Sequence, residues 1–317
     1  MRLGIITSSY GRLLGFLSAI LYIQSEDNLI EPLNIPTFRR NLWIFPDEHR
    51  YPYIGSLLRE RINILPSYFI WLYRIVTKFK WLSNLFVISQ DSFNLHQSLA
   101  WSNNFSMLDE LGQINPTQEL LRFLEEAQVN LEHYVVLHTR DSSWYQTLGI
   151  SQAYVNREDY RNSNMDDFRE IAKILLSRGY SVIRTGRSDS PLFDKEIKGY
   201  FDYASSSFSN DQDDFFLWQK TKWAVSTLNG GSNLGLLFKK RMLIWDYPEP
   251  TSHLANAIPF YPPNHVFLLQ RRHGSLAESK EKFASLEEVA DIFESSEYLS
   301  ETFRNFNLLS KSTIWYR

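Results

Sequence analysis

The sequence has no cysteine among its 317 residues. This absence excludes disulfide bonds, thiolate nucleophiles and cysteine-ligated metal sites, and it agrees with a reducing compartment. The chain also lacks the Gly-Lys-Ser or Gly-Lys-Thr end of a P-loop, which excludes a Walker-type nucleotide site. No stretch reaches the ~18 consecutive apolar residues that a membrane-spanning helix needs.

Residues 13–23 are apolar and follow Arg12, as in a secretory signal, but no small-residue cleavage site comes after them. We therefore expect a cytoplasmic protein, either soluble or peripheral at the inner face of the membrane. The formal net charge is −3, so no basic excess points to nucleic acid as a partner. With 44% hydrophobic and 22% charged residues, the chain has a globular composition and the length for two lobes.

The stretch Tyr134–Asp141, YVVLHTRD, combines a buried strand with a polar tip. Short apolar runs bounded by polar residues are typical of central strands in parallel sheets. The tip carries His138, Arg140 and Asp141, and open α/β sheets bind their ligands at the carboxyl ends of strands. We therefore expect a site here, with Arg140 exposed at the strand tip and with His138 and Asp141 as catalytic candidates.

The pattern of the chain predicts an α/β fold with two Rossmann-like lobes, built from parallel sheets flanked by helices. The predicted lobes are residues 1–128 on the acceptor side and 129–285 for nucleotide-sugar binding, with C-terminal helices at 286–317 packing back on the first lobe. In the first lobe we predict strands at 2–8 and 41–45 and helices at 13–24 and 117–130. In the second lobe we predict strands at 134–137, 180–184, 200–203, 223–227 and 242–245, and helices at 166–178, 211–221 and 234–238.

Several strand ends of the second lobe carry groups that bind phosphate. Guanidinium groups and the backbone N–H groups of a glycine turn are typical of such sites. The alternative is that the arginines form structural ion pairs with Asp141, Asp189 and Asp202. The candidate donor-binding residues are Arg140, Arg184, Gly186, Arg187, Gly230, Gly231, Ser232 and Asn233, with Tyr160, Arg161 and Asn162 covering the donor or ordering a loop.

Residues 65–88 form a long aromatic segment in which Arg74, Lys78 and Lys80 alternate with aromatic side chains. One interpretation is a helix that lies on an anionic membrane surface. The other is an amphipathic core helix with a solvated basic edge. The apolar positions are not confined to one face, which favours the core helix.

Five motifs of the second lobe resemble a family of bacterial glycosyltransferases of undefined acceptor specificity. They are HTRD at 138–141, YRNSN at 160–164, VIRTGR at 182–187, FDYASSSFSNDQDDFFL at 201–217 and the WAVST strand with its Gly-Gly turn at 223–231. His-x-Arg at a strand tip is also distantly similar to the fucosyltransferase-like branch of the GT-B fold. By this resemblance, Arg140 contacts the diphosphate of the donor, His138 shapes the donor site, and Ser232 and Asn233 contact phosphate or sugar.

The resemblance implies transfer of a sugar from a nucleotide-diphosphate donor to a glycan or lipid-linked glycan, as in surface-polysaccharide synthesis. No cofactor is implied, because the nucleotide sugar is a substrate. The opening loop of the first lobe, with Ser9, Tyr10, Gly11 and Arg12, would lie on the acceptor side. Arginines and a helix dipole would stabilise the leaving group without a metal.

The catalytic base stays open among Asp141 and two first-lobe residues, His96 and Asp109. The acidic cluster Asp211, Asp213 and Asp214 is either a metal site or a helix N-terminus, and the pattern favours the helix. Two other function classes also stay open. One is a non-catalytic nucleotide- or sugar-binding protein, and the other is a phosphohydrolase that uses His138 and Asp141.

Overall fold

The computed structural model describes residues 3–5, 42–44, 52–59, 63–82, 113–141, 151–153, 156, 162–227, 229, 231, 234–235, 238, 240–247 and 266–270. The chain divides into two compact units. The first unit comprises Met1–Asn115 with Asn210–Phe216, and the second comprises Pro116–Ser209 with Leu217–Arg317. The predicted C-terminal helices at 286–317 and the predicted helix at 13–24 lie outside the described residues.

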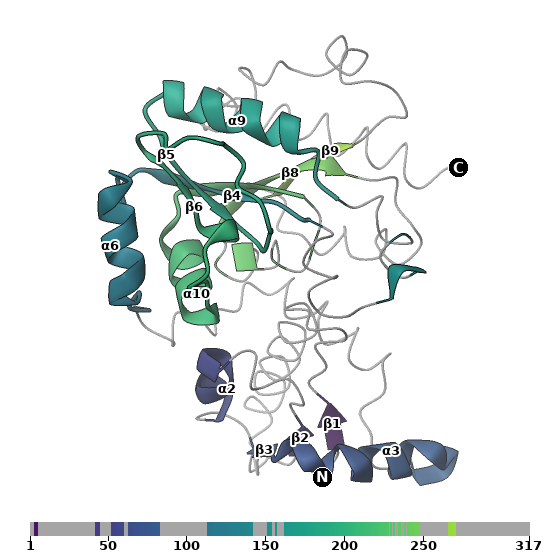
Figure 1. Ribbon diagram of the computed structural model, residues 1–317. Helices are drawn as coiled ribbons and strands as arrows, with labels where there is room; N and C mark the ends of the chain where they lie inside the picture. Colours follow the sequence, from purple (N-terminus) through teal and green to yellow (C-terminus); the bar gives the residue numbers. More distant parts are fainter. Residues whose placement is uncertain are drawn as a thin grey trace, which may run out of the picture. The chain divides into compact units, whose positions relative to one another are not determined.

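The first unit contains a parallel sheet in the order β1-β2-β3 (Figure 1). Its strands are β1 (Leu3–Ile5), β2 (Leu42–Ile44) and β3 (Asn63–Leu65). The first two strands confirm the sequence prediction, whereas β3 and the helix α2 (Pro52–Arg59) were not predicted. The aromatic segment begins with the short helix η3 (Ser67–Phe69) and continues as α3 (Ile70–Lys78).

The second unit contains a parallel sheet in the order β6-β5-β4-β7-β8-β9, which confirms the predicted α/β class. Counted along the chain, this is the order 3-2-1-4-5-6 of a Rossmann sheet. The chain first adds strands on one side of β4 and then crosses to the other side at β7. The strands are β4 (Tyr134–His138), β5 (Ser181–Thr185), β6 (Tyr200–Asp202), β7 (Trp223–Ser226), β8 (Arg241–Tyr247) and β9 (Val266–Gln270), the last of which was not predicted.

Helix α9 (Met165–Ser177) covers one face of this sheet, as Figure 1 shows. Its buried side chains Phe168, Ile171, Ala172 and Leu175 recur at the spacing of one helix face and pack against the apolar side chains of β4 and β5. Fully burying each of the larger ones contributes about 1.5–3 kcal/mol. The helix ends at Gly179, which has a φ of +83° that suits glycine.

Helix α10 (Asp211–Lys220) meets the opposite face through its last residues. The Tyr134 hydroxyl donates to the Leu217 carbonyl at 2.7 Å, and the Trp218 ring lies 5.7 Å from the His138 ring. Side chains of β4 therefore alternate between the two helices, with Val135 and Leu137 on the α9 side. This alternation decides on which face each polar residue at the end of β4 lies.

Helix α6 (Gln118–Glu126) confirms the prediction of a helix capped by threonine. The Leu120 amide donates to the Thr117 hydroxyl at 3.1 Å, and Leu120 and Leu124 are buried. No helix in the described part of the chain has the length and hydrophobicity that crossing a bilayer requires.

Candidate functional site

The carboxyl ends of β4, β5 and β7 meet at the point where the strand order reverses. The Thr139 amide donates to the Thr185 carbonyl at 3.2 Å, and the Thr227 amide donates to the His138 carbonyl at 3.3 Å. These bonds continue the ladder beyond the last residue of each strand. Open α/β sheets bind ligands just outside such a switch point, so His138–Arg140 lie at the edge of the sheet where a ligand is expected.

Ser163 fixes the backbone at Arg140 and bridges the switch point. Its hydroxyl accepts a hydrogen bond from the Arg140 amide at 2.8 Å and lies 3.3 Å from the Thr227 hydroxyl. Its own amide donates to the Arg140 carbonyl at 3.0 Å. Arg140 is only 6% exposed, so the prediction of an exposed tip arginine is wrong: the residue is enclosed where the strand ends and the 162–164 segment meet.

The His138 imidazole is enclosed by two glycines and two polar side chains. Its Nδ1 lies 2.9 Å from the Thr185 hydroxyl, and its ring forms a hydrogen bond with the Asn229 side chain. A Cβ on Gly231 would lie 2.1 Å from His138 Nε2, and one on Gly186 would lie 2.5 Å from the Thr139 carbonyl oxygen. Gly186 also has a φ of +114°, so both positions require glycine.

Gly231 therefore has a different role from the predicted phosphate cradle. Its amide donates to Asn229 Oδ1 at 2.8 Å, which uses the N–H group that was expected to hold phosphate. Asn229 Nδ2 in turn donates to the Thr227 hydroxyl at 3.1 Å. Hydrogen bonds among Thr227, Asn229 and Gly231 thus stabilise the chain after β7, and the absence of a side chain at Gly231 allows it to pack closely against His138.

Burial lowers the pKa of His138 to about 4. The hydrogen bond with Asn229 opposes this shift, and the positive charges of Arg187 and Arg184 add to it. A histidine with such a pKa is neutral at pH 7 and is a weak base, so the geometry argues against His138 as the general base. The positive charge of Arg187 favours an anion at the strand ends.

We expect the stability of the protein to fall between pH 6.5 and pH 4 in a way that depends on His138. The unfolded chain binds a proton on this histidine near pH 6.5, whereas the folded protein binds it only near pH 4. The contribution of neutral His138 to the free energy of unfolding is therefore complete above pH 6.5. It is lost, by up to roughly 3 kcal/mol, as the pH falls toward 4. Denaturant unfolding of the wild type and His138→Gln across this range tests it. Parallel pH profiles of the two proteins would contradict the expectation.

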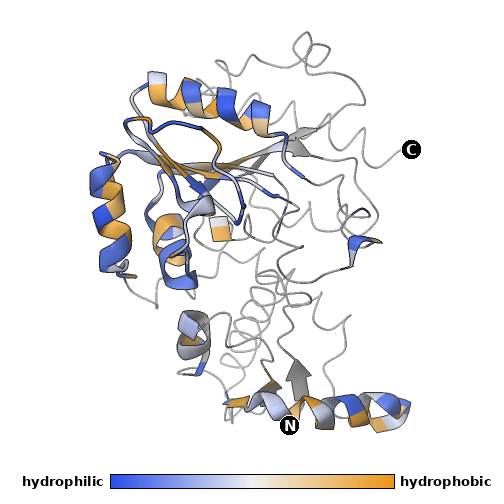
Figure 2. Ribbon diagram, viewed as in Figure 1, coloured by the Kyte–Doolittle hydropathy of each residue, from blue (hydrophilic) through white to orange (hydrophobic). Residues whose placement is uncertain are grey.

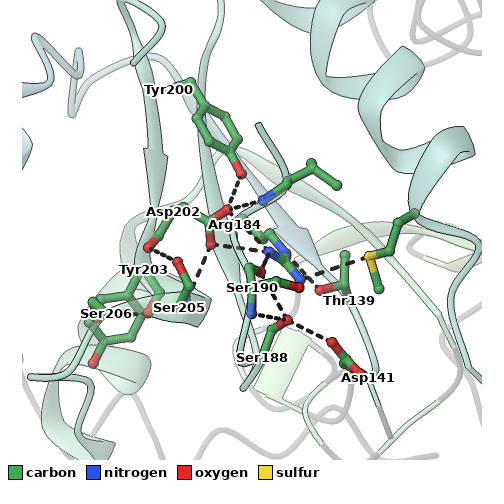
Figure 3. A network of polar contacts seen from close by, with 12 residues as sticks. Thr139, Asp141, Arg184, Ser188, Ser190, Tyr200, Asp202, Tyr203, Ser205 and Ser206 are labelled. Atoms are coloured by element: carbon green, nitrogen blue, oxygen red, sulfur yellow. Dashed lines mark hydrogen bonds and ion pairs between the residues drawn. The ribbon is translucent and has the colours of Figure 1, made fainter. Parts of the chain in front are cut away.

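Arg184 lies inside the α9 face of the sheet, and the geometry favours its structural alternative over donor binding (Figure 3). It is 1% exposed, and its guanidinium donates to Asp202 at 3.1 Å, to the Ser190 carbonyl at 2.9 Å and to the Thr139 hydroxyl at 3.0 Å. The register explains this position, because Arg184 is paired with Leu137 on one side and Asp202 on the other. An arginine satisfied by protein groups in this way does not reach a ligand.

Asp141 is tied to this same network through Ser188. The Ser188 hydroxyl lies 2.6 Å from Asp141 Oδ2 and 3.0 Å from the Ser190 carbonyl oxygen, as Figure 3 shows. The Ser188 amide is itself fixed by a hydrogen bond to the Ala204 carbonyl. The bond from Ser188 therefore orients the Asp141 carboxylate. Asp141 is only half-buried, so it also stays partly accessible to solvent.

Arg187 is the other arginine near the strand ends. Its Nη1 donates to the Gly186 carbonyl at 2.7 Å, and its guanidinium carbon lies 5.9 Å from the centre of the Tyr203 ring. It is half-buried and contributes positive charge at His138. Arg187 therefore remains a candidate for an anionic ligand together with Arg140.

The structure brings together some of the predicted site residues and leaves others outside the described residues. Asn162 is described and directly precedes Ser163, which fixes Arg140. Outside the described residues lie the acceptor-side Ser9, Tyr10, Gly11 and Arg12, the base candidates His96 and Asp109, and the donor-binding Tyr160, Arg161, Gly230, Ser232 and Asn233.

The acidic cluster at 211–214 is the N-terminus of α10, as the pattern favoured. Asn210 and Asp213 exchange hydrogen bonds, from the Asp213 amide to Asn210 Oδ1 at 2.9 Å and from Asn210 Nδ2 to Asp213 Oδ2 at 2.7 Å. This reciprocal arrangement caps the helix. Among the residues that the structure describes, no group of three His, Asp or Glu side chains is arranged to hold a metal ion.

Sequence reasoning missed the polar residues that position the site. Ser163, Thr185, Ser188, Thr227 and Asn229 make the contacts above, yet each is a common loop or strand-end residue. Only their positions in the sequence could have identified them, since each follows a predicted strand or lies inside one of the five motifs. Ser163 lies 23 residues from Arg140 and 64 from Thr227, and Thr185 and Ser188 each lie 47 residues from their partners His138 and Asp141, so these pairs have no local pattern.

Comparisons with known proteins agree with this architecture. No protein-family model and no curated protein matches the chain. The solved structures that it resembles include ADP-heptose LPS heptosyltransferase II of E. coli, with a TM-score of 0.52, 13% identity, and coverage of 94% of this chain and 100% of that one. A glycosyl transferase family 9 protein of Veillonella parvula has a TM-score of 0.50 and 10% identity, over 94% of this chain and 96% of that one. The chain therefore has the α/β fold of these glycosyltransferases.

Proposed function

We propose that this protein is a glycosyltransferase that moves a sugar from a nucleotide-diphosphate donor to a glycan of a surface polysaccharide. The observation that carries the proposal is the likeness to a heptosyltransferase over 94% of this chain and the whole of that one. Both neighbours are glycosyltransferases by name, and the likeness includes both units of this chain. The distant similarity to the fucosyltransferase-like branch of the GT-B fold remains a prediction from the sequence.

The strand ends of the second unit have the charge that a diphosphate needs. Arg140 lies at the switch point, and Arg187 follows β5 beside the Gly186 turn. Their positive charge would stabilise the negative charge that develops on the leaving nucleoside diphosphate. The proposal needs no cofactor, because the sugar nucleotide is itself the activated substrate, and these arginines would supply the role that a metal plays elsewhere.

In the proposed reaction, the oxygen of an acceptor hydroxyl forms a bond to the anomeric carbon of the donor sugar. The bond from that carbon to the diphosphate oxygen breaks, and its electron pair leaves with the nucleoside diphosphate. A general base takes the hydroxyl proton. Asp141 is the base candidate that we favour, because it follows β4 and accepts a hydrogen bond from Ser188 that orients its carboxylate. His96 and Asp109 remain the alternatives.

A donor screen tests the proposed function. The full-length protein would be titrated with ADP, UDP and GDP and then incubated with the matching sugar nucleotides and lipopolysaccharide-core acceptors. ADP-heptose belongs in this screen because the E. coli neighbour is named for it. We expect one nucleoside diphosphate to bind and its sugar donor to release that diphosphate only with acceptor. Binding without turnover of any donor would favour the non-catalytic binding protein, and phosphate release from simple esters would favour the phosphohydrolase.

A further inference from the structure

The first unit carries an exposed aromatic surface on and around α3. Among the described residues, the large hydrophobic side chains with the highest exposure all lie between residues 68 and 81. Trp71 is 53% exposed and Trp81 is 65% exposed, and no residue of α3 is buried. We call this the α3 surface, and it consists of Tyr68, Trp71, Arg74, Ile75, Lys78, Phe79, Lys80 and Trp81.

The arrangement differs from the core helix that the sequence favoured. Trp71, Arg74, Ile75 and Lys78 are spaced so that they share one face of the helix, and all four are exposed. Figure 2 shows hydrophobic and hydrophilic residues interleaved along α3. A core helix would bury its apolar residues and expose its basic ones. Here both kinds are presented to the same side.

The charge of this region has one sign. Between Glu60 and Asp91 the sequence has four basic residues and no acidic one, although the whole chain has a net charge of −3. Three of these basic residues, Arg74, Lys78 and Lys80, belong to the α3 surface and are exposed. The surface therefore combines large apolar side chains with an unopposed local positive charge, which complements an anionic partner.

We propose that the α3 surface docks the protein on an anionic lipid bilayer. Tryptophan and tyrosine prefer the depth of the lipid headgroups, and long basic side chains extend from there to lipid phosphates. Nine residues of α-helix are too short to span a bilayer, which needs about 20, so α3 would lie in the plane of the interface. A protein partner is a poorer fit, because lysine is depleted at the centre of protein interfaces.

Vesicle sedimentation tests this docking without any donor or acceptor, so its outcome is separate from that of the proposed function. We expect the full-length protein to sediment with mixed phosphatidylglycerol–phosphatidylcholine vesicles and to remain in solution with phosphatidylcholine alone. The variant Arg74→Gln/Lys78→Gln/Lys80→Gln should bind roughly 100-fold more weakly, since each basic residue near an anionic surface contributes about a factor of five. Trp71→Ala/Trp81→Ala should also lose binding.

A matched control removes the same charge elsewhere. Arg122, Lys195 and Lys198 are exposed residues of the second unit, and Arg122→Gln/Lys195→Gln/Lys198→Gln should bind vesicles as the wild type does. Circular dichroism would confirm that every variant is folded. The proposal is overturned if the wild type does not bind anionic vesicles, if both triple variants bind equally, or if the tryptophan pair is dispensable. Self-association that Trp71→Ala abolishes, without vesicle binding, would assign the surface to a second copy of the chain.

Discussion

The free energy of unfolding of Asp202→Asn is expected to be about 3–5 kcal/mol lower than that of the wild type, because the variant leaves the Arg184 charge buried without its counterion. Arg184 is 1% exposed, so water cannot replace the lost carboxylate. Asp202 also accepts hydrogen bonds from the Leu192 amide at 2.7 Å and from the Tyr200 hydroxyl at 2.8 Å. Burial, and then the neighbouring Asp202 carboxylate, raise the pKa of Tyr200, so this hydroxyl stays a donor.

An exposed pair of the same chemistry provides the control. Asp166 pairs with Arg169 on the surface of α9, where the two side chains are 83% and 41% exposed. Asp166→Asn should change stability by no more than about 1 kcal/mol, because water solvates both charges when the pair is broken. The midpoints of denaturant unfolding of the two variants give the comparison. Equal losses for Asp202→Asn and Asp166→Asn would show that the buried pair does not hold β5 to β6.

A second replacement separates charge burial from shape. In Arg184→Met/Asp202→Asn the buried cation is gone, so the double variant should recover part of the stability that Asp202→Asn loses. Met165, whose sulfur lies 3.8 Å from Arg184 Nη2, already provides an apolar neighbour for the new side chain. Additive losses for the two changes would mean that Arg184 and Asp202 contribute independently.

The sequence predicted the second-unit sheet well because its signals there are local and strong. Runs such as Tyr134–His138 are buried at every position, and helices such as α9 have regular apolar spacing and clear caps. The Thr117 cap and the Gly179 end were both readable from residue type alone. β3 was missed because it has only three residues. β9 is as long as β4 and follows the turn residues Pro262-Pro263-Asn264, so its signal was present in the sequence and was overlooked.

The role of Arg184 could not be predicted from the local sequence. Residues two apart in a strand share one face, and Val182 packs against α9. The alternation of side chains therefore already predicted that Arg184 lies on this buried face of the sheet. What the sequence did not contain was the register that sets Asp202 beside it. Without that pairing, an arginine at a strand end looks the same whether it binds a carboxylate of the protein or a phosphate of a ligand.

The two glycines at His138 illustrate the same limit. Glycine turns after strands suggested phosphate binding, and the residue types were right for it. The structure shows that Gly186 and Gly231 permit close packing around an imidazole and that the Gly231 amide is already bonded. Which atom a glycine approaches is a matter of tertiary distance, so residue type alone could not separate the two roles.

Arg140→Lys is expected to lower kcat/KM for the sugar donor by about 100-fold or more, as removal of one donor to a developing anion does elsewhere. Lysine keeps the charge but lacks the planar fork that binds two phosphate oxygens at once. Because Arg140 is 6% exposed, truncation to alanine would add a packing loss, and the lysine variant keeps most of the side chain in place. Arg122→Lys, at an exposed ion pair with Glu126, is the matched control and should leave activity unchanged.

Binding measurements then separate a diphosphate contact from a purely structural arginine. If Arg140 contacts the diphosphate, Arg140→Lys should weaken the affinity for the nucleoside diphosphate far more than that for the monophosphate of the same base. A structural arginine would weaken both equally, or would lower the unfolding midpoint without changing their ratio. We expect the larger loss for the diphosphate. Ser163 forms hydrogen bonds with both the N–H and the C=O of Arg140, and these fix the backbone from which the arginine side chain extends at the switch point. An unchanged ratio in a folded variant would remove Arg140 from the donor site and leave Arg187 as the arginine to test there.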